Sequence, residues 1–251
     1  MATISNFAYK GRGRVYLDGR EIGNVTNLEL SFSTEESTVK DYRTCSGGNY
    51  ASSIDIDEAN FTLTFADYSP DNISLAFFGS TSAIAAGAVT DESITAPSDL
   101  ASGADRFVKT AYPINTAQTV TVTTDPAGTT YTAGTDYEVR SGGILILGSG
   151  SISASDALLI DYTKIAATRV EALMAASVEK EMIIEGLNCA QSGAPTVVTV
   201  YRAKPSPAEA FSLITEDFAA ATLNGKMDAD TSKGSSVSQY FVADVATATP
   251  A

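Results

Sequence analysis

The sequence contains no histidine and no tryptophan, and it has only two cysteines among its 251 residues. Without histidine, the chain lacks the base of Ser-His-Asp and Cys-His catalysis and the commonest metal ligand. P-loop, paired CxxC and GxGxxG motifs are also missing. An enzyme built on this sequence would have to work with carboxylates alone, so we expect no enzymatic activity, no cofactor and no metal.

The two cysteines, Cys45 and Cys189, lie far apart in the sequence and have no partners at the spacing of a zinc site or a disulfide framework. We expect two independent thiols. The N-terminus has no apolar run behind its charges, and no window approaches 18 apolar residues. The sequence therefore predicts no signal peptide and no segment that spans a bilayer.

The formal charge is −14 and the isoelectric point is about 4.3. Such a surface repels nucleic acid phosphates and anionic membranes, so we expect neither to be bound. Threonine, serine, alanine and glycine are abundant, and only two or three short segments suit a helix. We predict a mostly β protein, long enough for one large domain or two smaller ones.

One long hairpin, from Asn24 to Asp67, organises the first third of the chain. Its first arm alternates apolar and polar residues around Leu28, Leu30 and Phe32, which is the period of a half-buried strand. In the second arm the apolar residues are Ile54 and Ile56, and then Phe61, Leu63 and Phe65. The parity changes between these two groups, so we predict a bulge or break at Glu58 to Asn60.

Between the two arms, Glu35 to Tyr50 shows no periodicity and carries mixed charge and a Gly-Gly pair. We expect this segment to be a polar excursion rather than strand, and a connection of that length is usually functional or disordered. After the hairpin, Ser69 and Pro70 predict the start of a short helix over Pro70 to Phe78 that Gly79 ends.

A run of short strands and turns occupies residues 88–164. Strands are expected around Ala88 to Ala96, Val120 to Val122, Tyr137 to Val139, Ile144 to Leu147 and Leu158 to Tyr162. This spacing indicates a small β-sandwich. We interpret residues 88–164 as a domain inserted into the first one, which comprises residues 14–87 and 165–251, with residues 1–13 as a flexible arm.

Beyond the insertion, the first domain is expected to resume with further strands. These are Val178 to Leu187, Thr196 to Ala203 and Val237 to Val245. A helical turn is predicted from Pro205 to Ile214. The Asn224-Gly225 dipeptide predicts a hairpin turn between Phe218 to Leu223 and Lys226 to Asp230.

Acidic residues recur on the predicted long strands, opposite the apolar ones. They are Glu29, Asp55, Asp57, Glu179, Glu181 and Glu185. Asp55 and Asp57 share a strand face about 7 Å apart, a spacing that suits Ca²⁺ or an acid/base pair, or simply a wetted row of carboxylates. Like charges side by side lower the stability of a sheet. We therefore interpret this row of carboxylates as a feature selected for what the acidic face meets. A surface past which a polyanion must slide would be built this way, because Lys or Arg would hold phosphates.

The long acidic hairpin, the capped helix after it, the second strand pair ending in Glu185-Gly186-Leu187-Asn188 and the closing strand resemble the tail tube (major tail) proteins of tailed bacteriophages. The resemblance covers Arg14 to Gly79 and about Arg169 to Val245. The segment from Thr132 to Lys164 is similar to the immunoglobulin-like modules of phage virion proteins.

The resemblance implies a β-sandwich or barrel domain with long hairpins and one short helix, plus the inserted sandwich. It implies a virion subunit, assembled in the host cytoplasm, whose hexameric rings stack into a tube. The tube would meet the tail tip or baseplate, tape-measure and terminator proteins and let DNA pass unheld during ejection. Because the insertion must lie outside the tube, a non-contractile tail is favoured.

In that family the two hairpins of each subunit form an inner barrel, and the excursion reaches the neighbouring ring. Carried onto this sequence, the lumen would be lined by Glu29, Asp55, Asp57, Glu179 and Glu181. The inter-ring loop would contain Glu36, Lys40, Asp41, Tyr42, Arg43 and Cys45.

Two other functions remain open from the sequence. A two-domain β-sandwich adhesin or surface-binding module would grip carbohydrate with its loops, although the chain has no tryptophan for a sugar platform. A hydrolase dependent on Asp55 and its neighbours is the third possibility.

Overall fold

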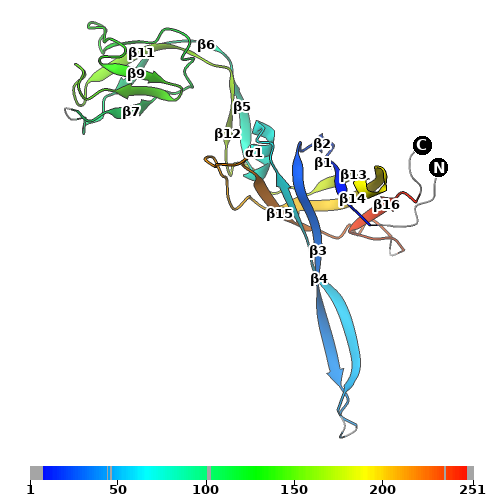
Figure 1. Cartoon of the computed structure of the whole chain (residues 1–251). Helices are drawn as coiled ribbons and strands as arrows, with labels where there is room; N and C mark the ends of the chain where they lie inside the picture. The colour runs from blue at the N-terminus through cyan, green and yellow to red at the C-terminus, as the bar shows by residue number, and fades with distance from the viewer. Residues whose placement is uncertain (1–7, 44, 46, 101–102, 235, 248–251) are drawn as a thin grey trace. The chain divides into compact units, whose positions relative to one another are not determined.

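A computed structural model describes residues 8–43, 45, 47–100, 103–234 and 236–247 of the chain. The protein is mostly β and folds as two compact units (Figure 1). Unit 1 comprises residues 1–80 and 170–251, and unit 2 comprises residues 81–169. Unit 2 is longer at both ends than the 88–164 predicted from turn signals. The difference arises because β5 (Ser80–Ile84) and β12 (Ala167–Glu171), which the sequence analysis missed, pair with each other in a two-stranded sheet.

An eight-stranded antiparallel sheet forms unit 1, in the order β2-β1-β13-β14-β15-β4-β3, with β16 also paired to β14. The strands are β1 (Gly11–Leu17), β2 (Arg20–Glu21), β3 (Val25–Lys40), β4 (Asn49–Phe65), β13 (Lys180–Asn188), β14 (Ala194–Pro205), β15 (Ala221–Met227) and β16 (Phe241–Val245). A single 3₁₀ turn, η1 (Cys189–Gln191), joins β13 to β14.

Strands from the two ends of this sheet share one hydrophobic core. Val15 and Leu17 of β1 belong to the same buried cluster as Phe61, Leu63 and Phe65 of β4. We infer that the sheet curves so that one of its faces surrounds this core. Glu29, Glu181 and Glu185 are exposed to solvent.

The N-terminal arm predicted over residues 1–13 is wrong for its last residues, while residues 1–7 lie outside the described part. β1 already begins at Gly11 and pairs with β13 as far as Asn188. A side chain on Gly13 would collide with the backbone of Glu185 and Gly186, so glycine there lets the two strands approach. The Gly-rich start that suggested flexibility is a packing requirement.

The helix α1 (Pro70–Ala76) follows the sequence prediction at its start. The Ser69 side chain accepts a hydrogen bond from the Asn72 N–H at 3.3 Å, as an N-cap should. The prediction for the end of the helix is wrong, because the residue in the left-handed conformation is Phe78, with φ of 48°, and not Gly79. α1 is the single α-helix of the described chain, and no described helix is long and apolar enough to cross a membrane.

Two turn and helix predictions in the last third of the chain are also wrong. Asn224 and Gly225 lie inside the continuous strand β15 rather than in a hairpin turn. A side chain on Gly225 would overlap the ring of Phe61, so this glycine serves close packing. Residues 206–220 contain no helix and form an irregular connection between β14 and β15.

Unit 2 is a small β-sandwich. One sheet has the order β7 (Arg106–Lys109), β10 (Gly143–Ile146), β9 (Tyr137–Arg140), and the other β6 (Gly87–Thr95), β11 (Ala157–Lys164), β8 (Thr121–Thr124). Side chains from both sheets, including Val122, Ile144, Ile146, Leu158 and Ile160, make one buried cluster. Five of these six strands are where the sequence predicts them, and β7 was missed.

Candidate assembly interface

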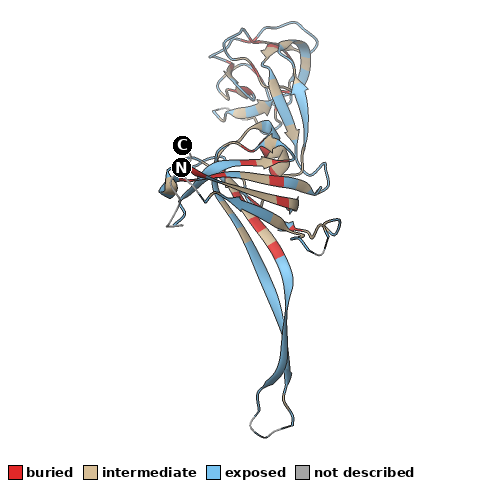
Figure 2. Cartoon of the chain, turned by 90° about the vertical axis from the view of Figure 1, so that its right-hand side faces the viewer, coloured by how far each residue is buried: buried red, intermediate tan, exposed pale blue. Residues whose placement is uncertain are grey.

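The pair β3–β4 continues well beyond the core of unit 1 (Figure 1). Residues 33–40 of β3 and 49–58 of β4 are exposed at every position, whereas β4 alternates between buried and half-buried from Ala59 to Phe65 (Figure 2). We call residues 33–40 and 49–58 the ribbon. At the usual rise per residue its two arms are about 25 Å and about 33 Å long. An isolated two-stranded ribbon is at best marginally stable in water, and this one is supported only where it joins the body of the sheet.

The excursion predicted over Glu35 to Tyr50 is therefore wrong in extent. β3 runs to Lys40 and β4 begins at Asn49, which leaves a loop of residues 41–48. Periodicity failed to reveal these strands because both faces of the ribbon are exposed, and polar residues are then tolerated at every position.

A bulge separates the ribbon from the body at Asp57. Ser33 pairs with Glu58, but Thr34 pairs with Ile56, so Asp57 is the extra residue of β4. The Ser33 hydroxyl accepts a hydrogen bond from the Glu58 N–H at 3.1 Å and lies 3.4 Å from a carboxylate oxygen of Asp57. The parity change predicted a bulge at Glu58 to Asn60, one residue too late.

The bulge places the isoleucines of the ribbon on the same side as the core. Phe32 pairs with Ala59, which is buried, and the next pairs on this side join Thr34 to Ile56 and Glu36 to Ile54. Phe32 still packs against the rings of Tyr240 and Phe241, with ring centroids at 6.1 and 6.0 Å. Ile56 and Ile54 follow with 52% and 67% of their surface exposed. The apolar side of the hairpin thus runs past the end of the core that would cover it.

The opposite side of β3–β4 is acidic. Glu35 and Asp55 are direct partners across the two strands, and Glu29 lies on the same side nearer the body. None of these three carboxylates forms an ion pair with any residue in the described parts of the chain. Paired like charges destabilise a hairpin, so folding alone does not explain this arrangement.

Only the base of the ribbon has its charge compensated. Lys226 of β15 donates to a Glu58 oxygen at 2.6 Å. This hydrogen bond, together with one from the Asn60 amide, lowers the pKa of the Glu58 carboxyl. β15 pairs with β4 only over Asn60–Phe65. The Lys226–Glu58 contact therefore lies where the pairing of β15 with the hairpin ends.

The predicted acids of the second strand pair divide into two groups. Glu181 and Glu185 are exposed on β13, and Glu185 accepts a hydrogen bond from the Tyr16 hydroxyl at 3.2 Å. Glu179 precedes β13 and is not a free carboxylate, because Arg202 binds it at 2.6 Å and lowers the pKa of its carboxyl. The structure therefore puts Glu29 and Asp55 together on one side of the long hairpin, with Asp57 at the bulge and Glu181 on a different strand.

No group of three or more Cys, Asp or Glu side chains in the described residues could hold a metal ion. The bulge interrupts the regular spacing that the sequence predicts for Asp55 and Asp57. A carboxylate oxygen of Asp57 lies 3.4 Å from the Ser33 hydroxyl, on the side of β3 that also carries Glu35, the partner of Asp55.

The residues predicted for an inter-ring loop fall in two places. Glu36 and Lys40 belong to β3, and Lys40 donates to the Asn49 side chain at 2.9 Å. Asp41, Tyr42, Arg43 and Cys45 belong to the loop. Arg43 binds the Asp41 carboxylate at 3.1 Å and lies 4.5 Å from the centre of the Tyr50 ring. The hydrogen bond from Arg43 lowers the pKa of Asp41, while the Tyr42 side chain and the free thiol of Cys45 are exposed.

Sequence reasoning missed the feature that most constrains assembly, which is the two free edges of the ribbon. β3 is the last strand of the sheet, and β4 has no second partner over residues 49–58 among the described residues. Each edge presents unpaired backbone N–H and C=O groups to solvent.

A comparison with curated proteins finds no match to this chain. The model of a family described as protein of unknown function UCP028589 matches residues 8–244, which include both units and the whole ribbon. The chain belongs to this family.

Proposed function

We propose that the protein is a structural subunit of a bacteriophage tail tube. Copies associate through the ribbon into a hexameric ring, and the rings stack into a tube that conducts DNA during ejection. The observation that carries the proposal is the ribbon itself, which exposes Ile54 and Ile56 on one side, pairs Glu35 with Asp55 on the other and is free at both edges.

The two free edges of the ribbon can pair with each other across a contact between copies. The β3 edge of one copy can pair with the β4 edge of the next, and that contact leaves the same two edges free at the ends of the pair. Such a head-to-tail contact is heterologous and closes into a ring when its rotation permits. Closure of a sheet into a barrel removes every exposed edge, which supports a ring over an open chain.

The two sides of the ribbon then take different roles. Ile54 and Ile56 pack against protein, either the neighbouring subunit or the next ring. Glu29, Glu35 and Asp55 face the lumen, where carboxylates repel phosphates and let DNA pass without being held. Unit 2 lies outside the tube, which favours a non-contractile tail. The loop of residues 41–48 meets the adjacent ring, and tail tip, terminator and tape-measure proteins are the expected partners at the tube ends and in its bore.

Negative-stain electron microscopy of the purified full chain tests this proposal. Rings or tubes are expected at high concentration, and the double variant Ile54→Asp, Ile56→Asp should remain folded and monomeric. Phe107→Asp, which changes an equally exposed apolar residue in unit 2, should assemble like the parent. A parent protein that stays monomeric at high concentration, or a double variant that still forms tubes, contradicts the proposal.

A further inference from the structure

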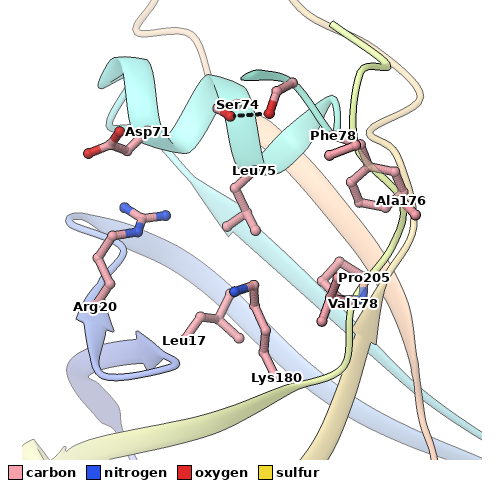
Figure 3. Close-up of a pocket in the computed structure, with 12 residues that line it drawn as sticks. Leu17, Arg20, Asp71, Ser74, Leu75, Phe78, Ala176, Val178, Lys180 and Pro205 are labelled. Atoms are coloured by element: carbon pink, nitrogen blue, oxygen red, sulfur yellow. Dashed lines mark hydrogen bonds between the residues drawn. The ribbon is translucent and has the colours of Figure 1, made fainter. Parts of the chain in front are cut away.

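The pocket beneath α1 in unit 1 contains cations that the chain itself already balances (Figure 3). It has a volume of about 500 Å³, and Arg20 and Asp71 lie at the same end of it. Arg20 donates a hydrogen bond to the Asn72 side chain at 2.7 Å, and Lys180 pairs with Asp18 at 3.5 Å. A charged ligand would gain little from these two cations, because each already has a partner.

A second pocket, of about 220 Å³, lies in unit 2 and is lined by cations without such partners. Lys109 of β7 and Arg169 of β12 line it together with Tyr112. The Nζ atom of Lys164, from β11, lies 4.3 Å from the centre of the Tyr112 ring. None of these three cations forms an ion pair with any residue in the described part of the chain. We call Lys109, Lys164 and Arg169 the basic cluster.

The Lys and Arg side chains of unit 2 that lack an ion pair among the described residues all belong to the basic cluster. The other two, Arg106 and Arg140, bind the carboxylates of Asp99 and Glu138. Acidic residues outnumber basic ones in this unit, so carboxylates that could neutralise the basic cluster exist but pair elsewhere or face solvent. Folding alone does not explain why three unpaired cations meet at one pocket.

Glu92 contacts a residue of the pocket wall but does not pair with the basic cluster. Its two oxygens accept hydrogen bonds from the Ala111 N–H at 2.7 Å and from the Tyr162 hydroxyl at 2.6 Å. Glu171 follows Arg169 by two residues on β12 and forms no ion pair with it. Even if Glu92 is counted against the basic cluster, two of its three positive charges remain uncompensated.

Contacts with Tyr112 and its neighbour hold the basic cluster in place before any ligand binds. Arg169 donates a hydrogen bond from Nη2 to the Ala111 carbonyl at 2.9 Å, and its guanidinium carbon lies 5.6 Å from the centre of the Tyr112 ring. The ring attracts both Lys164 and Arg169, although their like charges repel each other. A bound anion would relieve that repulsion. Arg169 also keeps most of its N–H donors available for an oxyanion, because one hydrogen bond uses only one of them.

From these observations we infer that the pocket of unit 2 binds a phosphate monoester group. Arginine binds such oxyanions through two parallel hydrogen bonds, and lysine adds a compact positive charge. A phosphate monoester carries a charge of about −1.5 to −2 at pH 7, which matches the uncompensated charge of the basic cluster. The pocket is smaller than the range of about 300–1,000 Å³ that encloses drug-sized ligands, so it suits the charged end of a molecule. This inference concerns unit 2 alone and does not depend on the tail-tube proposal.

An NMR titration of the isotope-labelled full chain with sodium phosphate tests the inference. The variant Ile54→Asp, Ile56→Asp is used as the parent, so that self-association of the ribbon cannot interfere, and sodium chloride keeps the ionic strength constant. Saturable shifts are expected for the amides of residues 109–112 and 167–169, and chloride alone should not produce them. Shifts that do not saturate, or that spread evenly over both units, would overturn the inference.

Charge-neutralising variants separate this site from a general effect of charge. Arg169→Gln should weaken phosphate binding by about tenfold, because a hydrogen bond from a charged donor is lost. Arg169→Lys should recover part of the affinity. Lys109→Gln changes an exposed side chain, so it should also weaken binding without disturbing the fold. Arg106→Gln removes the same charge from the ion pair with Asp99 and should bind like the parent. Equal weakening by Arg106→Gln, or unchanged binding in Arg169→Gln and Lys109→Gln, would contradict the site.

Three further probes identify the ligand class. Glucose 6-phosphate should shift the same amides as inorganic phosphate, and glucose should not. A short DNA duplex should not shift them, because its phosphodiesters carry one charge each and the chain as a whole is acidic. Shifts caused by glucose alone, or by the duplex at concentrations equal to those of phosphate, would overturn the assignment to a phosphate monoester.

Discussion

The two halves of the β3–β4 hairpin are formed by the same two paired strands, yet they differ in the burial of their side chains and in the pairing of their edges. In the body half, Phe61, Leu63 and Phe65 are at most 1% exposed and β15 covers one edge. In the ribbon half, every described side chain is exposed and both edges are free. The backbone pairing is thus common to both halves, and burial of one face distinguishes the body half from the ribbon.

The largest effect should come from truncating the body half. Leu63→Ala removes a fully buried side chain and is expected to lower the free energy of unfolding by about 2–5 kcal/mol, because a cavity remains in the core. Ile54→Ala, at an equivalent strand position in the ribbon, should change the stability of the monomer by less than about 0.5 kcal/mol. Urea denaturation at low protein concentration measures both. Equal losses at the two positions would mean that the ribbon packs against the chain's own core.

A smaller effect is expected from the paired carboxylates of the ribbon. Glu35→Lys replaces a like-charge pair with Asp55 by an opposite-charge pair, which should stabilise the ribbon by about 0.2–1 kcal/mol. Hydrogen exchange of the ribbon amides should slow accordingly, while the amides of the body half keep their rates. Thr62→Lys, opposite Glu29 in the supported half, serves as the control. Faster exchange in the ribbon after Glu35→Lys would show that the acidic pair is not strained.

The smallest effect concerns the junction of the two halves, where Lys226 binds Glu58. The folded state lowers the pKa of Glu58, so this contact stabilises the protein above the ordinary carboxylate pKa. The contribution disappears as the pH falls through the lowered value. Lys226→Met should therefore reduce the unfolding midpoint slightly at pH 7, and the difference between variant and parent should shrink as the pH falls through the lowered pKa of Glu58. NMR titration should show the pKa of Glu58 rising in the variant.

Sequence patterns predicted the strands with one buried face well and the strands that are exposed on both faces poorly. The alternation through Leu28 to Phe32 and Phe61 to Phe65 identified the buried halves of both arms, because a covered face imposes period two. The same rule predicted most strands of unit 2. The change of parity at Ile56 indicated a bulge within one residue of Asp57.

What could not be predicted depends on tertiary contacts or on their absence. Residues 35–40 were interpreted as loop because no face is covered and no period is imposed. Asn224-Gly225 has strong local turn chemistry, but packing of Gly225 against Phe61 keeps β15 straight. The ion pair of Glu179 with Arg202 joins residues far apart in the sequence, so the pattern of acids alone could not separate it from Asp55.

Both chain connections to unit 2 leave unit 1 at neighbouring points. Gly79 lies directly beside Glu171, since a side chain on Gly79 would contact the Glu171 carbonyl at 2.8 Å. Because the two connections to unit 2 are neighbours, the inserted domain does not require two distant points of unit 1 to be joined. The entropic cost of closing the loop also rises only slowly with the length of the insertion. Because β5 and β12 pair with each other and hold the two connections together, we expect that residues 85–166 could be exchanged for another fold with neighbouring termini without changing the eight-stranded sheet.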